Sequence, residues 1–235
     1  MLLYFRQELW RIAVATLRSL PGARWRDPDL DARLGWYIVL GTIPIGIFGL
    51  IFSNQIESGA RSLYVIGIAL ILFSFVMLRA EAVGRERAAA AGHRDAPIGA
   101  DVGSRELSTI TPRDGLFIGV FQAIALIPGV SRSGATISAG LFRGFERTDA
   151  ARYSFLLSVP AVVLSGLFEL RKIGDGDGAG AVPTAIATLL AFVVGYASIA
   201  FLLRFLARHS IGVFCGYRIA LGVIVLVLAG TGVIS

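Results

Sequence analysis

Five apolar runs, each about long enough to cross the hydrocarbon core of a membrane, limit the folds open to this chain. They cover residues 35–52, 63–78, 150–170, 182–206 and 211–234, and the first two contain no charged residue. Of all residues, 55% are hydrophobic and 16% are charged, and the mean hydropathy is +0.74. Soluble domains are much more polar than this. The sequence therefore predicts an all-α, polytopic integral membrane protein with a single membrane domain over residues 1–235.

The charged residues predict the orientation of these runs. The chain has 22 Lys and Arg against 16 Asp and Glu, but the arginines flank the apolar runs and form no single basic stripe, so we expect no nucleic-acid partner. Arginines cluster before residue 35, in residues 79–113 and in residues 143–152, whereas Arg61 stands alone between the first two runs. By the positive-inside rule, the polar segment of residues 79–114 is expected to be a cytoplasmic loop.

Two apolar stretches between this loop and the third run are too short to span a membrane. Residues 116–127 number about a dozen and residues 134–142 fewer, against the roughly 20 that a spanning helix needs. Arginine-rich segments precede and follow them, so the chain is expected to return to the side from which it entered. We therefore predict two half-helices that form a re-entrant hairpin, whose turn must face protein or a water-filled cavity.

The sequence LIPGVSRSGATI, residues 126–137, forms the predicted turn of this hairpin. Pro128 disfavours helix at the residue before it, and Gly129 and Gly134 allow backbone angles closed to other residues. Either Ser131 or Ser133 can cap the second half-helix, whose free N–H groups then point into the turn. Together with the guanidinium of Arg132 and the hydroxyl of Thr136, these groups predict a binding site for a phosphate or diphosphate.

A simpler interpretation stands beside this one. A Ser- and Gly-rich turn with one Arg can be a topological corner, with the guanidinium reaching the membrane interface. An Arg near the bilayer centre costs roughly 2.5 to 3.5 kcal/mol on insertion scales, and this cost favours a functional role. For Arg218, in the last apolar run, we expect the guanidinium to reach the nearer interface. Cys215 has no second cysteine with which to form a disulfide or a thiol metal site.

PGVSRSGATI, preceded by FQAIALIPG and followed by FRGFERTDAARYSFLLSVPA, resembles the second signature of the bacterial undecaprenyl-diphosphate phosphatases of the bacitracin-resistance type. GTIPIGIFGLIF early and GYRIALGVIVL late extend the resemblance over essentially the whole chain. It implies inverted repeats with two re-entrant hairpins, and a multi-pass protein of the bacterial plasma membrane. It also implies hydrolysis of undecaprenyl diphosphate to the monophosphate, which recycles the lipid carrier for cell-wall synthesis.

The resemblance also assigns roles to residues of this chain. Arg132 would clamp the diphosphate, and Ser131 would act with it in catalysis. The substrate-binding residues would be those that donate to phosphate oxygens, allow close approach of the backbone or orient a neighbour: Ser133, Thr136, Gly129, Gly134 and Gln122. A divalent cation, Mg²⁺ or Ca²⁺, is the implied cofactor. Besides membrane lipid, the implied partners are a polyprenyl diphosphate as substrate and, as an open question, a second copy of the chain.

The sequence departs from the family pattern in its first part. The family's first signature, a Glu-containing helix followed by a Ser-rich turn and a His, has no counterpart before Gly35. Glu8 does not match it, and neither His93 nor His209 replaces the missing His. We find no metal ligand in this sequence, so the first repeat is expected to be incomplete. Three hypotheses follow: a lipid diphosphatase, a polyprenyl-phosphate transporter or flippase, and an inactive, N-terminally truncated fragment.

Overall fold

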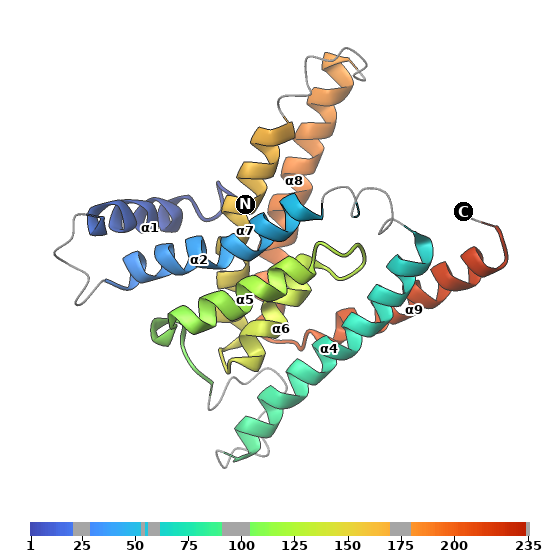
Figure 1. Ribbon diagram of the computed structural model, residues 1–235, viewed down its shortest axis with the longest axis horizontal. Helices are drawn as coiled ribbons and strands as arrows, with labels where there is room; N and C mark the ends of the chain where they lie inside the picture. The colour runs from blue at the N-terminus through green and yellow to red at the C-terminus, as the bar shows by residue number, and fades with distance from the viewer. Residues whose placement is uncertain (21–28, 53–54, 56–61, 91–103, 170–179, 234–235) are drawn as a thin grey trace.

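The computed structural model describes residues 1–20, 29–52, 55, 62–90, 104–169 and 180–233, and these residues form an all-helical fold (Figure 1). Within these ranges, β-structure is limited to an isolated bridge between Arg105 and Phe145. The predicted all-α class is therefore confirmed. The helices are α1 (Arg6–Ser19), α2 (Leu30–Ile51), α4 (Leu63–Ala90), η1 (Leu107–Thr109), α5 (Pro112–Ile124), α6 (Arg132–Phe142), α7 (Arg147–Glu169), α8 (Ala181–Leu206) and α9 (Gly212–Gly230).

Five of the described helices are long and apolar enough to cross a membrane: α2, α4, α7, α8 and α9. They coincide with the five apolar runs, so the prediction of a polytopic membrane protein is confirmed. Pro44 lies inside α2 and Pro160 inside α7. Proline is tolerated in membrane helices because neighbouring helices and side chains satisfy the backbone groups that it frees.

The short helices α5 and α6 lie at the centre of the molecule (Figure 1). They pack against each other, α2 packs along α5, and α4 and α7 pack against α6. The buried core runs through the same helices and includes Ile118 of α5, Ile137 of α6 and Leu156 of α7. The longer helices thus enclose the two short ones, as irregular backbone at membrane depth requires.

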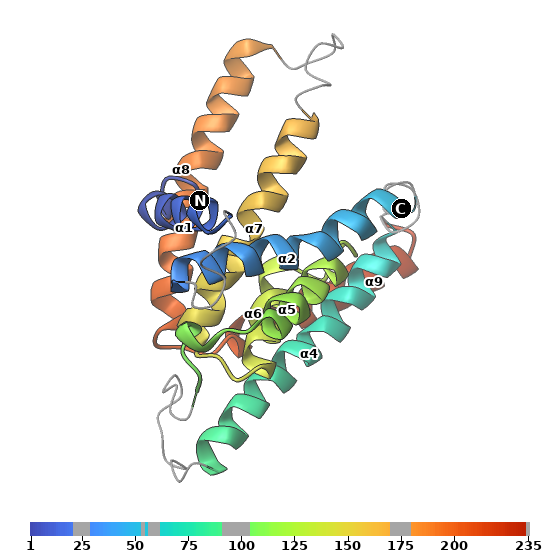
Figure 2. The same ribbon diagram turned by 60° about the vertical axis from the view of Figure 1, so that its left-hand side comes forward.

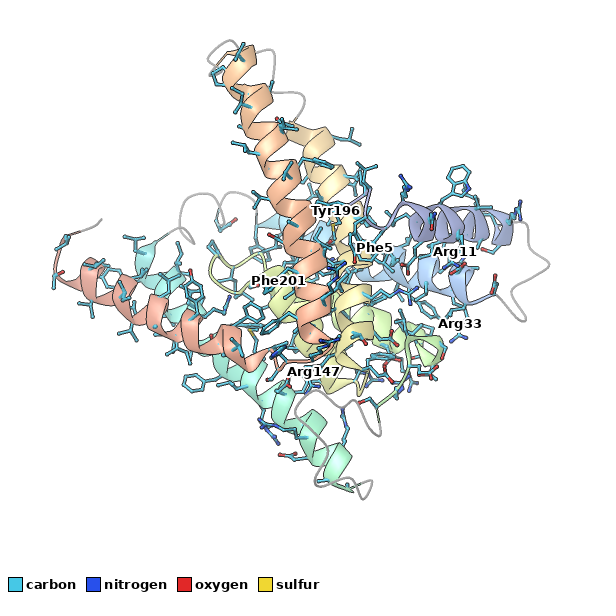
Figure 3. All side chains as sticks on the ribbon, turned by 180° about the vertical axis from the view of Figure 1, so that it is seen from behind. Phe5, Arg11, Arg33, Arg147, Tyr196 and Phe201 are labelled. Atoms are coloured by element: carbon cyan, nitrogen blue, oxygen red, sulfur yellow. The ribbon has the colours of Figure 1, made fainter. Side chains whose placement is uncertain are left out.

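Two pairs of helices extend from this centre. α4 and α9 run side by side, and α7 and α8 project together on another side (Figures 1 and 2). Figure 3 shows Phe5 and Tyr196 close together where the start of the chain meets α8, and the rings of Tyr4 and Tyr196 lie 5.5 Å apart. Most of α8 has an exposed apolar surface, which suits a helix that faces lipid.

The bounds predicted for the cytoplasmic loop, residues 79–114, are wrong at both ends, because residues there are helical. α4 continues to Ala90, and α5 begins at Pro112; residues 91–103, which include His93, lie outside the described residues. The continuation of α4, RAEAVGRERAAA, is rich in Ala, Glu and Arg, which favour helix. Tertiary contacts fix it, since Arg87 donates to the Leu141 and Phe142 carbonyls at 2.8 and 2.7 Å.

Glycines let α2 and α5 approach each other closely. A Cβ atom placed on Gly119 of α5 would lie 2.4 Å from the carbonyl oxygen of Gly41 and 2.5 Å from its Cα. One placed on Gly41 would lie 2.9 Å from the carbonyl oxygen of Gly115. The contacts are with backbone, which cannot rotate away as a side chain can. Small residues at such crossings are common where membrane helices pack.

Replacing Gly119 with alanine is therefore expected to push α5 away from α2 and to lower stability by about 1–3 kcal/mol, the range of overpacked cores. Thermal unfolding of the detergent-solubilised protein measures this effect. Gly46 of α2 is the matched control, because a Cβ there would meet no atom within 4 Å and alanine favours helix over glycine. Equal stability of the Gly119→Ala and Gly46→Ala variants would contradict the prediction.

Candidate phosphate-binding site

The candidate site lies in the turn between α5 and α6. α5 has 13 residues and α6 has 11, so at 1.5 Å per residue neither can cross a hydrocarbon core of about 30 Å. The prediction of two short helices is confirmed, although each begins earlier than predicted. α5 begins at Pro112 because Thr111 and Asp114 form a capping box, and Pro112 occupies the first helical position.

The backbone of the turn is tightly folded and includes an unusual serine. After α5 the chain continues in tighter turns with 3₁₀-type hydrogen bonds. The amides of Ala125, Leu126 and Ile127 donate to the carbonyls three residues earlier, over 3.0–3.2 Å. Gly129 has φ +97°, and Ser131 has φ 71°, a left-handed conformation that no other described residue besides glycine adopts. Serine in this region costs free energy, and such residues concentrate at functional sites.

Ser131 is the residue that caps α6. Its hydroxyl accepts a hydrogen bond of 3.3 Å from the Gly134 amide, and its carbonyl accepts one of 2.9 Å from Ala135. The amides of Arg132 and Ser133, in the first turn of α6, have no carbonyl partner within the helix. The positive end of the α6 dipole therefore lies beside Ser131 and Ser133. The sequence analysis named these two serines as alternative caps of this helix.

Arg132 is the described cation best placed to bind an anion. Its side chain is partly buried, and no described residue forms a hydrogen bond or ion pair with its guanidinium. Ser133, next to it, is also partly exposed. Arg132, Ser131 and Ser133 thus combine a cation, free amides and hydroxyls at one helix start, which is the set of groups that proteins use for phosphate.

Thr136, Gly134 and Gly129 face neighbouring helices in this structure. The Thr136 hydroxyl is fully buried and hydrogen-bonds with Ser154 of α7 and with the Arg132 carbonyl at 2.9 Å. A Cβ on Gly134 would lie 3.1 Å from the sulfur of Met77, and one on Gly129 would lie 2.6 Å from the carbonyl oxygen of Ile66. The structure gives these glycines a packing role against α4. Their predicted contact with substrate stays a prediction.

Gln122 lies near the end of α5 and is fully buried. Neither its amide nitrogen nor its amide oxygen has a hydrogen-bond partner among the described residues. The hydroxyls of Ser138 in α6 and Tyr153 in α7 are likewise buried without a hydrogen-bond partner among the described residues. Buried polar groups are normally paired, because an unpaired one costs about 1–3 kcal/mol. The assignment of Gln122 to the substrate site stays a prediction, and its unpaired amide is compatible with it.

A comparison with protein families matches residues 1–224 to the family described as Bacitracin resistance protein BacA. The chain belongs to this family. The signature around Arg132 and the early and late apolar segments therefore form parts of one family pattern, and the resemblance in the sequence is confirmed.

Curated relatives of this BacA-family chain carry the name undecaprenyl-diphosphatase. The protein of Mycobacterium sp. (strain KMS) is 48% identical over 240 residues, which cover 100% of this chain and 79% of the relative. The protein of Mycolicibacterium smegmatis is 46% identical over 238 residues, with 100% and 79% covered. The protein of Nocardia farcinica is 43% identical over 269 residues, with 100% and 80% covered.

The divalent cation expected from the BacA family does not fit the described residues. No three of their His, Cys, Asp and Glu side chains gather in a group that could hold a metal ion. Glu8 pairs with Arg152 at 2.7 Å, and Glu81 pairs with Arg147, which Figure 3 labels. His209 is exposed and stacks on Phe205.

Arg218 of α9 is a residue whose position the sequence analysis predicted wrongly. Its side chain does not reach the interface: it is only 9% exposed, and it donates to the carbonyls of Gly129 at 2.7 Å and Val130 at 3.1 Å. It also donates to the Ser74 hydroxyl of α4 at 3.3 Å. A guanidinium can satisfy several carbonyls at once, and the unpaired carbonyls of a turn at membrane depth need such a donor. No local signal in the sequence indicates these partners.

A second cluster of charges holds the opposite end of the hairpin. Asp114, fully buried at the start of α5, pairs with Arg105 at 3.0 Å and with Arg143, which follows α6. Its carboxylate also accepts hydrogen bonds of 2.9 Å from the Thr111 amide and 2.7 Å from the Thr111 hydroxyl. Asp114 thereby ties the start of α5 to the end of α6. The sequence analysis placed Asp114 in a loop and missed this role.

Proposed function

We propose that this chain hydrolyses undecaprenyl diphosphate to undecaprenyl phosphate and inorganic phosphate, and so recycles a lipid carrier for cell-wall synthesis. Membership in the BacA family and curated relatives named undecaprenyl-diphosphatase support this reaction. The observation that carries the proposal is Arg132, a guanidinium without an anionic partner among the described residues, in the turn of a hairpin too short to cross the membrane.

The residues of the turn serve this reaction by neutralising charge. Arg132 offers a planar fork that matches two oxygens of a phosphate group. The first amides of α6 add the positive end of a helix dipole, and the Ser131 and Ser133 hydroxyls can donate to remaining oxygens. In phosphoryl transfer, such preorganised donors stabilise the charge that spreads over the equatorial oxygens in the transition state.

Phosphate release from undecaprenyl diphosphate by the detergent-solubilised chain tests the proposal, with the Mycobacterium relative as positive control. We expect inorganic phosphate and undecaprenyl phosphate in equal amounts. Lipid transport is the alternative, because re-entrant hairpins also occur in transporters. Movement of polyprenyl phosphate across a vesicle membrane without phosphate release would favour that alternative. Neither activity, with an active control, would favour the inactive-fragment hypothesis.

The finer features of the proposal concern the location of the chain, its effect on bacitracin resistance, its substrate, its assembly and its cofactor. We place the chain in the bacterial plasma membrane, where overproduction is expected to raise resistance to bacitracin. The substrate is a polyprenyl diphosphate lipid, and a homodimer is proposed from the family resemblance alone. Dependence of phosphate release on Mg²⁺ or Ca²⁺ stays a prediction, tested by adding and removing a chelator. Membrane fractionation and the mass of the detergent-solubilised particle test the location and the dimer.

A further inference from the structure

Arg218 connects three parts of the molecule that are far apart in sequence. Its α9 backbone packs beside α4, its Nε atom donates to Ser74 of α4, and one terminal nitrogen donates to the carbonyls of Gly129 and Val130. Ser74 is itself fully buried and donates to the Leu70 carbonyl at 2.7 Å. The guanidinium is thus held in place by a rigid helix pair before it reaches the turn.

The two carbonyls that Arg218 holds directly precede the strained part of the turn. Val130 is followed by Ser131, whose φ of 71° directs the chain into α6. A peptide plane is rigid, so fixing the Gly129 and Val130 carbonyls also fixes the Val130 and Ser131 amides on the other side of each plane. The orientation of Ser131 then determines where the free amides of α6 and the Arg132 backbone lie.

Arg218 is a buried cation without a carboxylate partner among the described residues, and it is stabilised by carbonyl and hydroxyl oxygens. A buried charge of this kind is costly in a membrane and is seldom present without a task. Stabilising the turn alone would need only neutral donors. The fork of a guanidinium adds a fixed direction to these bonds, which an ammonium or an amide does not reproduce.

We propose that Arg218 is a positioning residue of the phosphate-binding turn: by holding the Gly129 and Val130 carbonyls against α4, it keeps Ser131 in its left-handed conformation and aims Arg132 and the first amides of α6 at the diphosphate. Arg218 does not contact the substrate in this arrangement. The inference rests on the proposed function for its activity readout, whereas the exchange readout below is independent of that function.

Three substitutions of Arg218 separate its possible roles. Arg218→Met removes donors and charge, Arg218→Lys keeps the charge without the fork, and Arg218→Gln keeps a neutral donor. Displacing a reacting or binding group by about 1 Å can lower a rate by about 100-fold. We therefore expect Arg218→Met to lower kcat by about 100-fold with a smaller change in KM. Lys and Gln are expected to restore only part of this loss. Tyr217→Met is the matched control, since Tyr217 is an exposed neighbour on the same helix.

Hydrogen–deuterium exchange of the detergent-solubilised variants supplies the second readout. In Arg218→Met, amides of residues 126–137 are expected to exchange about tenfold faster or more, as expected when two charge-assisted hydrogen bonds are lost. Amides of α4 and α9 should keep their protection, and Tyr217→Met should change neither region. If the unsubstituted chain releases no phosphate, the proposed function fails, and the exchange experiment still decides the role of Arg218.

Four results would overturn the positioning role. Unchanged exchange and unchanged turnover in Arg218→Met would show that the turn does not need the guanidinium. Lost turnover with unchanged exchange in residues 126–137 would show that Arg218 acts on the substrate directly. Equally faster exchange throughout α4, α9 and the turn in Arg218→Met would show that Arg218 only supports the fold. Full activity of Arg218→Lys would show that the charge matters and that the planar fork of the guanidinium does not.

Discussion

Replacing Arg132 with alanine is expected to lower phosphate release by about 1,000-fold or more, the scale on which a transition-state arginine contributes to phosphoryl transfer. Its guanidinium has no ion pair or hydrogen bond with any described residue, so within this part of the chain the substitution breaks no side-chain bond. What disappears is the cation that neutralises the diphosphate at the start of α6. Arg132→Lys should restore little of the activity, because an ammonium is a point charge and cannot bind two oxygens in a fixed plane.

The matched control for Arg132 is Arg113, an exposed arginine at the start of α5. Arg113→Ala changes the net charge by the same amount at the other end of the hairpin and should leave turnover close to that of the unsubstituted chain. Thermal unfolding of each variant shows whether the fold is retained. Undiminished turnover in a folded Arg132→Ala variant would remove Arg132 from the site and support the topological-corner interpretation of the turn.

Features that depend on local sequence were predictable. The apolar runs gave the spanning helices, because hydropathy and length act within one segment. The two short helices followed from their length and from Pro128 and Gly129 in the turn. The cap of α6 was narrowed to Ser131 or Ser133, and the left-handed φ of Ser131 decides between them. The guanidinium of Arg132, which has no hydrogen-bond or ion-pair partner in the part of the chain that the structure describes, fits the role that both the residue pattern and the resemblance give it.

Features that depend on partners distant in sequence were not predictable. Arg218 was expected to reach the interface, yet its carbonyl partners lie 89 and 88 residues earlier in the chain. The assignment of Thr136 to the substrate site stays a prediction, but the bond of its hydroxyl to Ser154, 18 residues later, could not be predicted. The charged end of α4 suggested a loop, because the sequence does not reveal that Glu81 meets Arg147 from 66 residues away. Such contacts arise only when the helices pack.

Asp114 illustrates the same limit and gives the largest expected effect on stability. Replacing it with asparagine should lower the free energy of unfolding by about 3 kcal/mol, because it removes a buried anion from between two partly exposed arginines, Arg105 and Arg143. Thermal unfolding in detergent measures the change. Glu86 is the control: it pairs with Arg79 at 2.8 Å, but both side chains are exposed. Glu86→Gln should therefore lower the free energy of unfolding by less than about 1 kcal/mol. Equal losses in the two variants would contradict the prediction.

The stabilisation by Asp114 should also depend on pH in a defined direction. Burial alone would raise the pKa of this carboxyl, but hydrogen bonds from Arg105, Thr111 and Arg143 outweigh burial and lower the pKa from 3.8 to about 2. A carboxyl whose pKa is lower in the folded state stabilises the fold fully above its unfolded pKa and loses this contribution as the pH falls toward the folded value. The difference in unfolding free energy between the unsubstituted chain and Asp114→Asn should therefore be constant above a pH of about 4 and should shrink between about 4 and about 2. A pH series of unfolding curves for both proteins measures this difference, and a difference that stays constant or grows over that range would show that the two arginines do not stabilise the ionised carboxylate.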